Sequence, residues 1–155
     1  MREDYSPQWF WKKLTGRVKR YSRFLLVTLL MVAIRLGLRW VQLPKLLHWL
    51  SVLPRSPVQN HQDFKELAYC TDRVLKVFPY NAKGNCLPRS LILYTMAPVF
   101  GLQVKFHCGV RKGGSGLDGH AWLTQNGEPI LEFTQQRVGM IETFIYPESE
   151  YRQHG

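Results

Sequence analysis

Three residues whose types suit nucleophilic catalysis lie close together in the sequence: Cys86, His120 and Glu132. A thiol attacks a carbonyl carbon as its thiolate, and a neighbouring imidazole takes up the thiol proton and later protonates the leaving amine. A carboxylate completes the set by orienting the imidazole. The order thiol, imidazole, acid therefore predicts a Cys-His-acid triad that works through a thioester.

The run that follows Cys86 predicts the helix that activates it. Residues 87–100 are largely apolar, with Pro88 in the first turn, where a missing N–H is harmless. Pro98 must bend or end this helix, and Gly101 suits its C-terminal cap. The positive end of a helix lowers the pKa of a thiol, and the free N–H groups near Asn85 and Cys86 are placed to form an oxyanion hole.

A hairpin is predicted to position the other two residues. Asn126-Gly127 is a strong turn signal between expected strands at 119–124 and 128–133. Pairing about this turn sets residue 120 opposite residue 133 or so, which leaves Glu132 within one position of a direct cross-strand neighbour of His120. Alternation predicts another strand over 103–111, a flexible glycine-rich turn over 112–116, and an edge strand over 141–146.

Helices are predicted before this catalytic part. The helix expected over 8–40 is apolar all round between Phe24 and Ile34 apart from Thr28. Two central arginines cost roughly 5–7 kcal/mol in a membrane span, which about a dozen apolar residues return. Packing on the catalytic part, which we favour, a place at a membrane surface, and a membrane span therefore all stay open. Shorter helices are expected over 44–50 and 61–78.

This order predicts an α+β fold, in which helices precede an antiparallel sheet. We expect a basic helical region over 1–60, the catalytic domain over 61–146, and a frayed tail over 147–155. Residues 1–60 hold 11 Lys and Arg against two acids, whereas residues 61–155 hold 10 against nine. The positive charge is therefore expected to lie away from the site chemistry.

The three cysteines, Cys70, Cys86 and Cys108, have no paired spacing, which favours free thiols in a reducing compartment. We expect a cytoplasmic protein, with membrane association through residues 12–39 left open. The five histidines do not lie at zinc-site spacings from the cysteines, so neither a metal nor a cofactor is expected.

The local sequence also resembles a known family. The chain reads NCLPRSL at 85–91, HCGVRK at 107–112 and LDGHAWL at 117–123. This combination is similar to the transglutaminase-like family and, within it, to the B2 leader peptidases of lasso-peptide biosynthesis. The resemblance implies a papain-like cysteine peptidase fold, with Cys86 as nucleophile, His120 as general base and acid, and Glu132 in a place where the family more often has Asp.

The same resemblance implies the reaction and the partners. The reaction is removal of the leader from a ribosomally made precursor peptide. The partners are that precursor, a separate small leader-recognition protein (B1) and an asparagine-synthetase-like cyclase; no fused winged-helix recognition domain is expected. Around the site, the resemblance places Arg111 and Trp122 beside the cleft. We expect a core role for Trp122, a solvated Arg89, and no chemistry at His107 and Cys108.

Two other functions remain as alternatives. A transglutaminase-like acyl transferase uses the same triad but delivers the acyl group to an amine. A non-enzymatic adaptor would bind an anionic membrane or nucleic acid through the basic residues 12–39. The aromatic residues Trp9, Phe10 and Trp11 show no base-stacking layout, so nucleic acid is not an expected partner.

Overall fold

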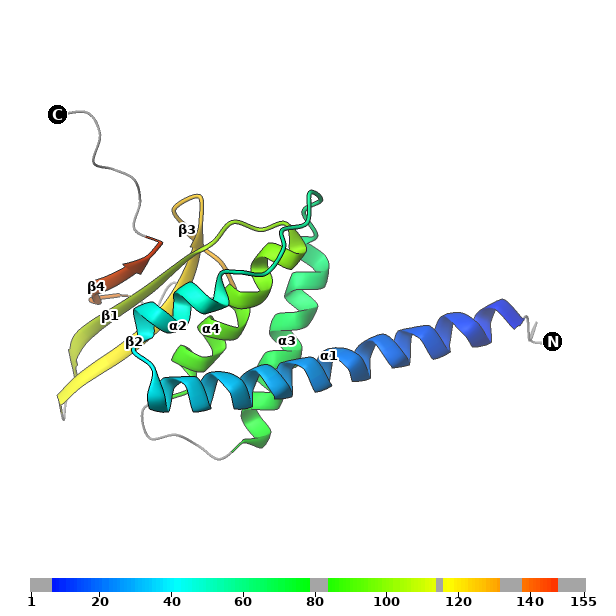
Figure 1. Ribbon diagram of the computed structural model, residues 1–155, viewed down its shortest axis with the longest axis horizontal. Helices are drawn as coiled ribbons and strands as arrows, with labels where there is room; N and C mark the ends of the chain where they lie inside the picture. Colours follow the sequence, from blue (N-terminus) through cyan, green and yellow to red (C-terminus); the bar gives the residue numbers. More distant parts are fainter. Residues whose placement is uncertain (1–6, 79–83, 114–115, 132–137, 148–155) are drawn as a thin grey trace.

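The computed structural model describes residues 7–78, 84–113, 116–131 and 138–147, with side chains of the first helix described from Tyr21 onward. Helices come first and the sheet follows (Figure 1). The elements are α1 (Pro7–Trp40), α2 (Leu43–Leu50), α3 (His61–Val77), α4 (Cys86–Met96), the 3-10 helix η1 (Ala97–Phe100), β1 (Lys105–Gly113), β2 (Gly116–Gln125), β3 (Glu128–Pro129) and β4 (Ile141–Tyr146). The predicted α+β layout is confirmed.

The strands form one antiparallel sheet in the order β3-β2-β1-β4. β1 and β2 make a long hairpin, whose register runs from Lys105 opposite Thr124 to Gly113 opposite Gly116. The glycine-rich turn is therefore shorter than predicted, because both strands extend into it. β4 adds to the outer edge of β1, as expected for the last strand.

The hairpin around Asn126-Gly127 keeps the predicted register but ends early. Thr124 lies opposite Pro129 and Gln125 opposite Glu128, the pairing that would set residue 120 opposite residue 133. The prediction of a strand continuing through 130 and 131 is wrong. Pro129 has no N–H to donate, and Leu131 has φ +58°, which turns the chain out of extended geometry. Glu132 itself lies outside the described residues.

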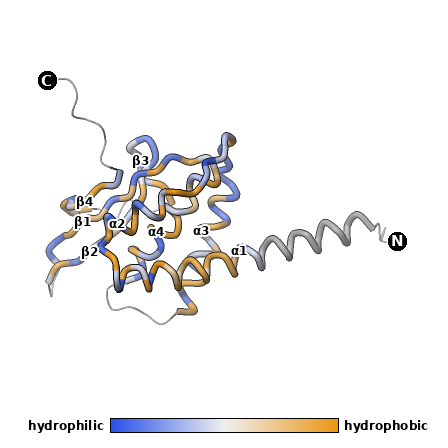
Figure 2. Tube along the Cα trace, viewed as in Figure 1, coloured by the Kyte–Doolittle hydropathy of each residue, from blue (hydrophilic) through white to orange (hydrophobic). Residues whose placement is uncertain are grey.

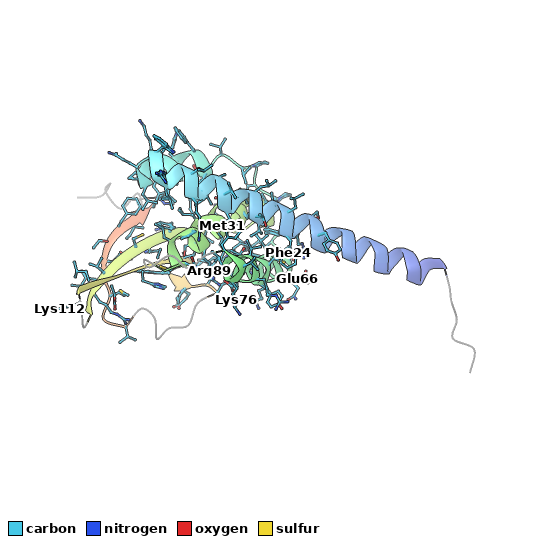
Figure 3. All side chains as sticks on the ribbon, turned by 90° about the horizontal axis from the view of Figure 1, so that it is seen from below. Phe24, Met31, Glu66, Lys76, Arg89 and Lys112 are labelled. Carbon is cyan, nitrogen blue, oxygen red and sulfur yellow. The ribbon has the colours of Figure 1, made fainter. Side chains whose placement is uncertain are left out.

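Helix α4 is the centre of the core. Its residues from Ser90 to Met96 are all buried, because the sheet covers one side of the helix and other helices cover the rest. From α1, Val27, Met31 and Ile34 are fully buried in the same cluster as Phe106 of β1. At right angles to the first view, α1 and α2 form an outer layer over α3 and α4, with Met31 labelled on α1 (Figure 3). The favoured expectation that this helix packs on the catalytic part is confirmed.

Gly101, which ends η1, lies tightly against the segment that joins α2 to α3. This segment runs along η1 through hydrogen bonds from Ser56 N to Pro98 O (2.9 Å) and from Asn60 N to Phe100 O (3.0 Å). Gly101 has φ +73°, and a Cβ atom there would lie 2.5 Å from the carbonyl oxygen of Val58. Glycine at this position is therefore required twice, by its backbone angle and by the close approach.

Replacing Gly101 with alanine should destabilise the fold more than the same change at Gly127, which has φ +84° but open space around it. Both variants take on the left-handed strain of roughly 1–2 kcal/mol. Gly101→Ala must also push a backbone oxygen away, so its free energy of unfolding should fall by at least about 1 kcal/mol more. Urea denaturation measures both values, and equal losses would contradict the close approach.

Candidate active site

The first turn of α4 lies against β2, and one hydrogen bond sets this placement. Ser90 is buried, and its Oγ donates to the carbonyl oxygen of Ala121 over 2.9 Å. Cys86 is one turn earlier on the same face of α4, because residues four apart align on a helix. Its Sγ therefore lies beside β2, where the thiol donates to the carbonyl oxygen of Gly119 over 3.9 Å.

Cys86 and His120 are brought together, and this pairing changes the thiol. Burial raises the pKa of Cys86, but a hydrogen bond with the His120 side chain, hydrogen bonds from the backbone of Ala121 and Leu87, and the charge of His120 lower it. The net result is a pKa below that of an ordinary cysteine. A helix start and an imidazole are the surroundings that favour a thiolate. Both residues are half-buried, which leaves the sulfur within reach of a substrate.

The segment that leads to Glu132 is tied down by Arg89, although Glu132 is outside the described residues. Arg89 Nε donates to Asp72 Oδ1 of α3 (2.6 Å), and Nη2 donates to the carbonyl oxygen of Leu131 (3.1 Å). The expectation of a solvated Arg89 is therefore wrong. Its guanidinium joins α3, α4 and the chain leaving β3, so it holds the residue immediately before Glu132.

Trp122 of β2 lies between two imidazoles. Its ring stacks on His107 (centroids 5.4 Å apart, planes 10° apart) and on His120 (6.0 Å and 15°). Trp122 is buried, as expected of a core residue, but it is not a member of the cluster around α4. The stack limits how the ring of His120 can tilt, so Trp122 also contributes to the position of the candidate base.

His107 anchors the other end of this stack. Its Nδ1 lies 2.6 Å from Glu142 Oε2 of β4, and its Nε2 lies 2.8 Å from Thr124 Oγ1 of β2. Because a carboxylate accepts, Nδ1 must carry a proton, and Nε2 can accept from the hydroxyl in the neutral ring. Sequence alternation set His107 apart from the apolar face of its strand but gave no sign of Glu142, because Glu142 belongs to β4, which is distant in the sequence.

The rim of the site includes a cation from α1. Arg35 Nη2 lies 3.5 Å from Asn85 Oδ1, and its guanidinium sits 5.4 Å from the ring centroid of Phe78. Asn85 is the residue directly before Cys86, so the expectation that the positive charge of the first 60 residues lies apart from the site needs correction here. Arg111, which the resemblance places beside the cleft, lies 3.6 Å from Asp118 towards the far end of the β1–β2 hairpin.

None of the three cysteines forms a disulfide, as predicted, and the pKa values of Cys86 and Cys108 are shifted in opposite directions. Cys108 pairs across the sheet with Ala121, and burial together with the nearby Cys86 raises its pKa to about 11. Cys70 is buried in the core. Among the described residues, no group of three or more His, Cys, Asp or Glu side chains is arranged to hold a metal ion.

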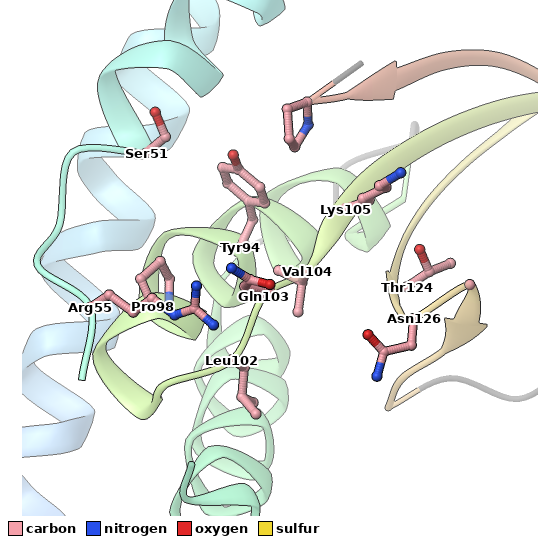
Figure 4. Close-up of a pocket in the computed structure, with 12 residues that line it drawn as sticks. Ser51, Arg55, Tyr94, Pro98, Leu102, Gln103, Val104, Lys105, Thr124 and Asn126 are labelled. Carbon is pink, nitrogen blue, oxygen red and sulfur yellow. The ribbon is translucent and has the colours of Figure 1, made fainter. Parts of the chain in front are cut away.

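A cavity of about 500 Å³ lies at the opposite end of α4 (Figure 4). Tyr94, Arg55, Gln103 and Lys105 are among the residues that line it. Burial and the neighbouring Tyr146 raise the pKa of Tyr94 to about 12, so its hydroxyl stays protonated. Neither Cys86 nor His120 lines this cavity, so the candidate nucleophile lies elsewhere, where the first turn of α4 meets β2.

Comparison with known proteins adds one finding. A family model described as the transglutaminase-like superfamily matches residues 28–143. No curated protein and no solved structure matches the chain significantly. The matched region begins within α1 and ends in β4, so it runs across residue 60; the division of the chain at that residue stays a prediction. The superfamily match agrees with the papain-like and transglutaminase-like fold predicted from the sequence.

Alkylation should single out Cys86. The rate of alkylation follows the thiolate fraction, so for Cys86 the midpoint of rate against pH should lie below that of an ordinary cysteine. His120→Asn removes a hydrogen bond and a charge that lower this pKa, so the midpoint should move to higher pH. Iodoacetamide labelling followed by peptide mass spectrometry measures the rate at each cysteine.

Cys108 is the internal control, because its raised pKa keeps it a thiol near neutral pH. It should remain unlabelled while Cys86 reacts. If Cys86 in His120→Asn titrated at the same pH as in the parent chain, the pairing of the two side chains would be contradicted.

Proposed function

Because the chain belongs to the transglutaminase-like superfamily, which includes cysteine peptidases and acyltransferases, we propose that it is a cysteine peptidase that removes the leader from a ribosomally made lasso-peptide precursor. The observation that carries the proposal is the pairing of Cys86, at the start of α4, with His120 of β2. A thiol of lowered pKa beside an imidazole is the pair that acyl chemistry requires.

The proposed reaction has two steps. The Cys86 thiolate forms a C–S bond to the scissile carbonyl carbon, the C–N bond breaks, and His120 gives its proton to the leaving amine. His120 then takes a proton from water as the water oxygen bonds to the same carbon and the C–S bond breaks. The first N–H groups of α4 have no acceptor within the helix, so they are placed to hold the oxyanion of both steps.

Glu132 is proposed as the residue that orients His120. Two observations on the residues before it support this proposal: the β2–β3 pair has the register predicted from the sequence, and Arg89 donates to the carbonyl of the preceding Leu131. Its extra methylene, compared with aspartate, suits a segment that has already left the strand at Leu131. A carboxylate at this place would hold the imidazole in one orientation and stabilise its charged form.

The narrower role as a leader peptidase is supported by the three motifs around these residues, at 85–91, 107–112 and 117–123. On this proposal the partners are the precursor peptide, a separate B1 recognition protein and an asparagine-synthetase-like cyclase. Three cysteines with no disulfide among them suit the reducing cytoplasm in which such a precursor is made.

Cleavage of a precursor in water enriched in oxygen-18 tests both the nucleophile and the acceptor. The chain should be incubated with a lasso precursor peptide, a B1 recognition protein and an asparagine-synthetase-like cyclase. Hydrolysis should give a leader whose new carboxylate carries one heavy oxygen. Cys86→Ala should lower the cleavage rate by at least about a thousandfold, because the thioester cannot form.

Cys108→Ala is the matched control, because it removes a neighbouring thiol that the mechanism does not use, and it should cleave at close to the parent rate. Parent-rate cleavage by Cys86→Ala would overturn the assignment of the nucleophile. A leader joined to an added amine, with no heavy oxygen, would instead identify an acyl transferase with the same thioester. Absence of any processing, with an intact fold, would leave the adaptor function as the better explanation.

A further inference from the structure

Helix α1 presents two apolar faces, and the core uses one of them. Val27, Met31 and Ile34 are buried against the rest of the domain. On the other side Leu29, Leu36 and Trp40 remain 60%, 56% and 81% exposed. The run of hydrophobic residues along α1 is visible in Figure 2. One apolar face of α1 is therefore left in contact with solvent.

The exposed residues form one continuous stripe. They recur at steps of three and four positions, which places them on a single side of a helix. The stripe consists of Leu25, Leu29, Val32, Leu36 and Trp40. It extends over roughly 22 Å at 1.5 Å per residue. An exposed apolar surface of this kind marks an interaction site.

The charges around the stripe have one sign. Residues 5–62 contain no Asp or Glu, yet they hold ten Lys and Arg. Arg39 and Lys45 are exposed near the end of the stripe, and Trp49 of α2 is exposed beside them in the sequence. Apolar residues with tryptophan at their border and cations around them are the composition of helices that lie on anionic membranes.

We propose that the stripe on α1 docks this protein onto the surface of an anionic lipid bilayer, with the helix lying in the plane of the interface. This goes beyond the proposed peptidase function and does not depend on it. Side chains stand out from the outer layer formed by α1 and α2, where such a surface would meet them (Figure 3). The cations of this layer would face lipid phosphates, while the stripe enters the acyl boundary.

Tyr21–Trp40 is long and apolar enough to cross a bilayer. The packing of α1 on the domain nevertheless favours a position on the bilayer surface over a span. Its inner face is part of the domain core, and its Arg23 donates to Asp63 and Glu66 of α3. Arg35 reaches Asn85 beside the candidate nucleophile. A span would remove these groups from their partners, so docking through the outer face is the arrangement that keeps the fold.

A second copy of the chain suits the stripe less well. Pairing two stripes would bring two basic surfaces together whichever way the helices run, because residues 5–62 hold ten Lys and Arg and no carboxylate to offset them. Anionic phosphates supply the missing negative charge at high density. Charge complementarity therefore selects the bilayer among the occupants that an apolar stripe can accept.

Co-sedimentation with vesicles tests the proposal. The full chain should bind vesicles of phosphatidylcholine with phosphatidylglycerol at least tenfold more tightly than vesicles of phosphatidylcholine alone, and added salt should weaken this binding. Leu29→Gln with Leu36→Gln should weaken binding at least tenfold. The matched control, Val77→Gln with Leu117→Gln, changes two residues that are at least as exposed but lie away from the stripe, and it should bind as the parent chain does.

Circular dichroism and the pH profile of Cys86 alkylation show that each variant is folded, so loss of binding cannot be mistaken for unfolding. Failure of the parent chain to bind anionic vesicles at low salt would overturn the proposal. Equal binding by the stripe variant and its control would also overturn it, because the charges alone would then suffice. Two other results would overturn it by identifying a different occupant: a dimer, or a complex with an acidic protein, that Leu29→Gln with Leu36→Gln dissociates. Vesicle association that survives alkaline carbonate would overturn it as well, because it indicates a membrane span.

Discussion

The buried hydrogen bond from Ser90 to Ala121 is the contact on which the candidate site depends. It joins the central helix α4 to β2, and the four-residue spacing then carries Cys86 to the same strand. A buried hydroxyl without an acceptor costs about 1–3 kcal/mol, so sliding α4 along the sheet is unfavourable even though the surrounding core is apolar. One polar pair within the core therefore sets the distance between thiol and imidazole.

Burial alone does not decide how the thiols behave. It raises the pKa of both Cys86 and Cys108, yet the outcome for the two is opposite. Cys86 begins a helix and meets donors from His120, Ala121 and Leu87, which together outweigh burial. Cys108 sits within β1, where burial and the nearby Cys86 both raise its pKa. The chemistry of the site is thus a property of the helix start, and the neighbouring thiol shows what the same surroundings do without it.

Much of the fold could be predicted because its signals are local. The start of α4, the cap at Gly101 and the register of the Asn126-Gly127 hairpin each depend on a few adjacent residues. The contacts that escaped prediction join distant parts of the chain. Arg89 and Asp72 are 17 positions apart, and Arg35 and Asn85 are 50 apart. When the partner of a charged side chain belongs to another helix, the local sequence predicts that the side chain is solvent-exposed. The surroundings of the site could therefore not be found from local patterns.

Three successive residues of α1 show why composition could not assign a role to this helix. Ile34 is buried in the core, Arg35 reaches the rim of the candidate site, and Leu36 is exposed in the stripe. Each step turns the side chain by about 100°, so neighbours in the sequence face different surroundings. A segment that is apolar all round carries no sequence signal for which side meets the domain. The packing of α3 and α4 decides that, and it leaves the stripe outside while bringing one of the basic residues to the site.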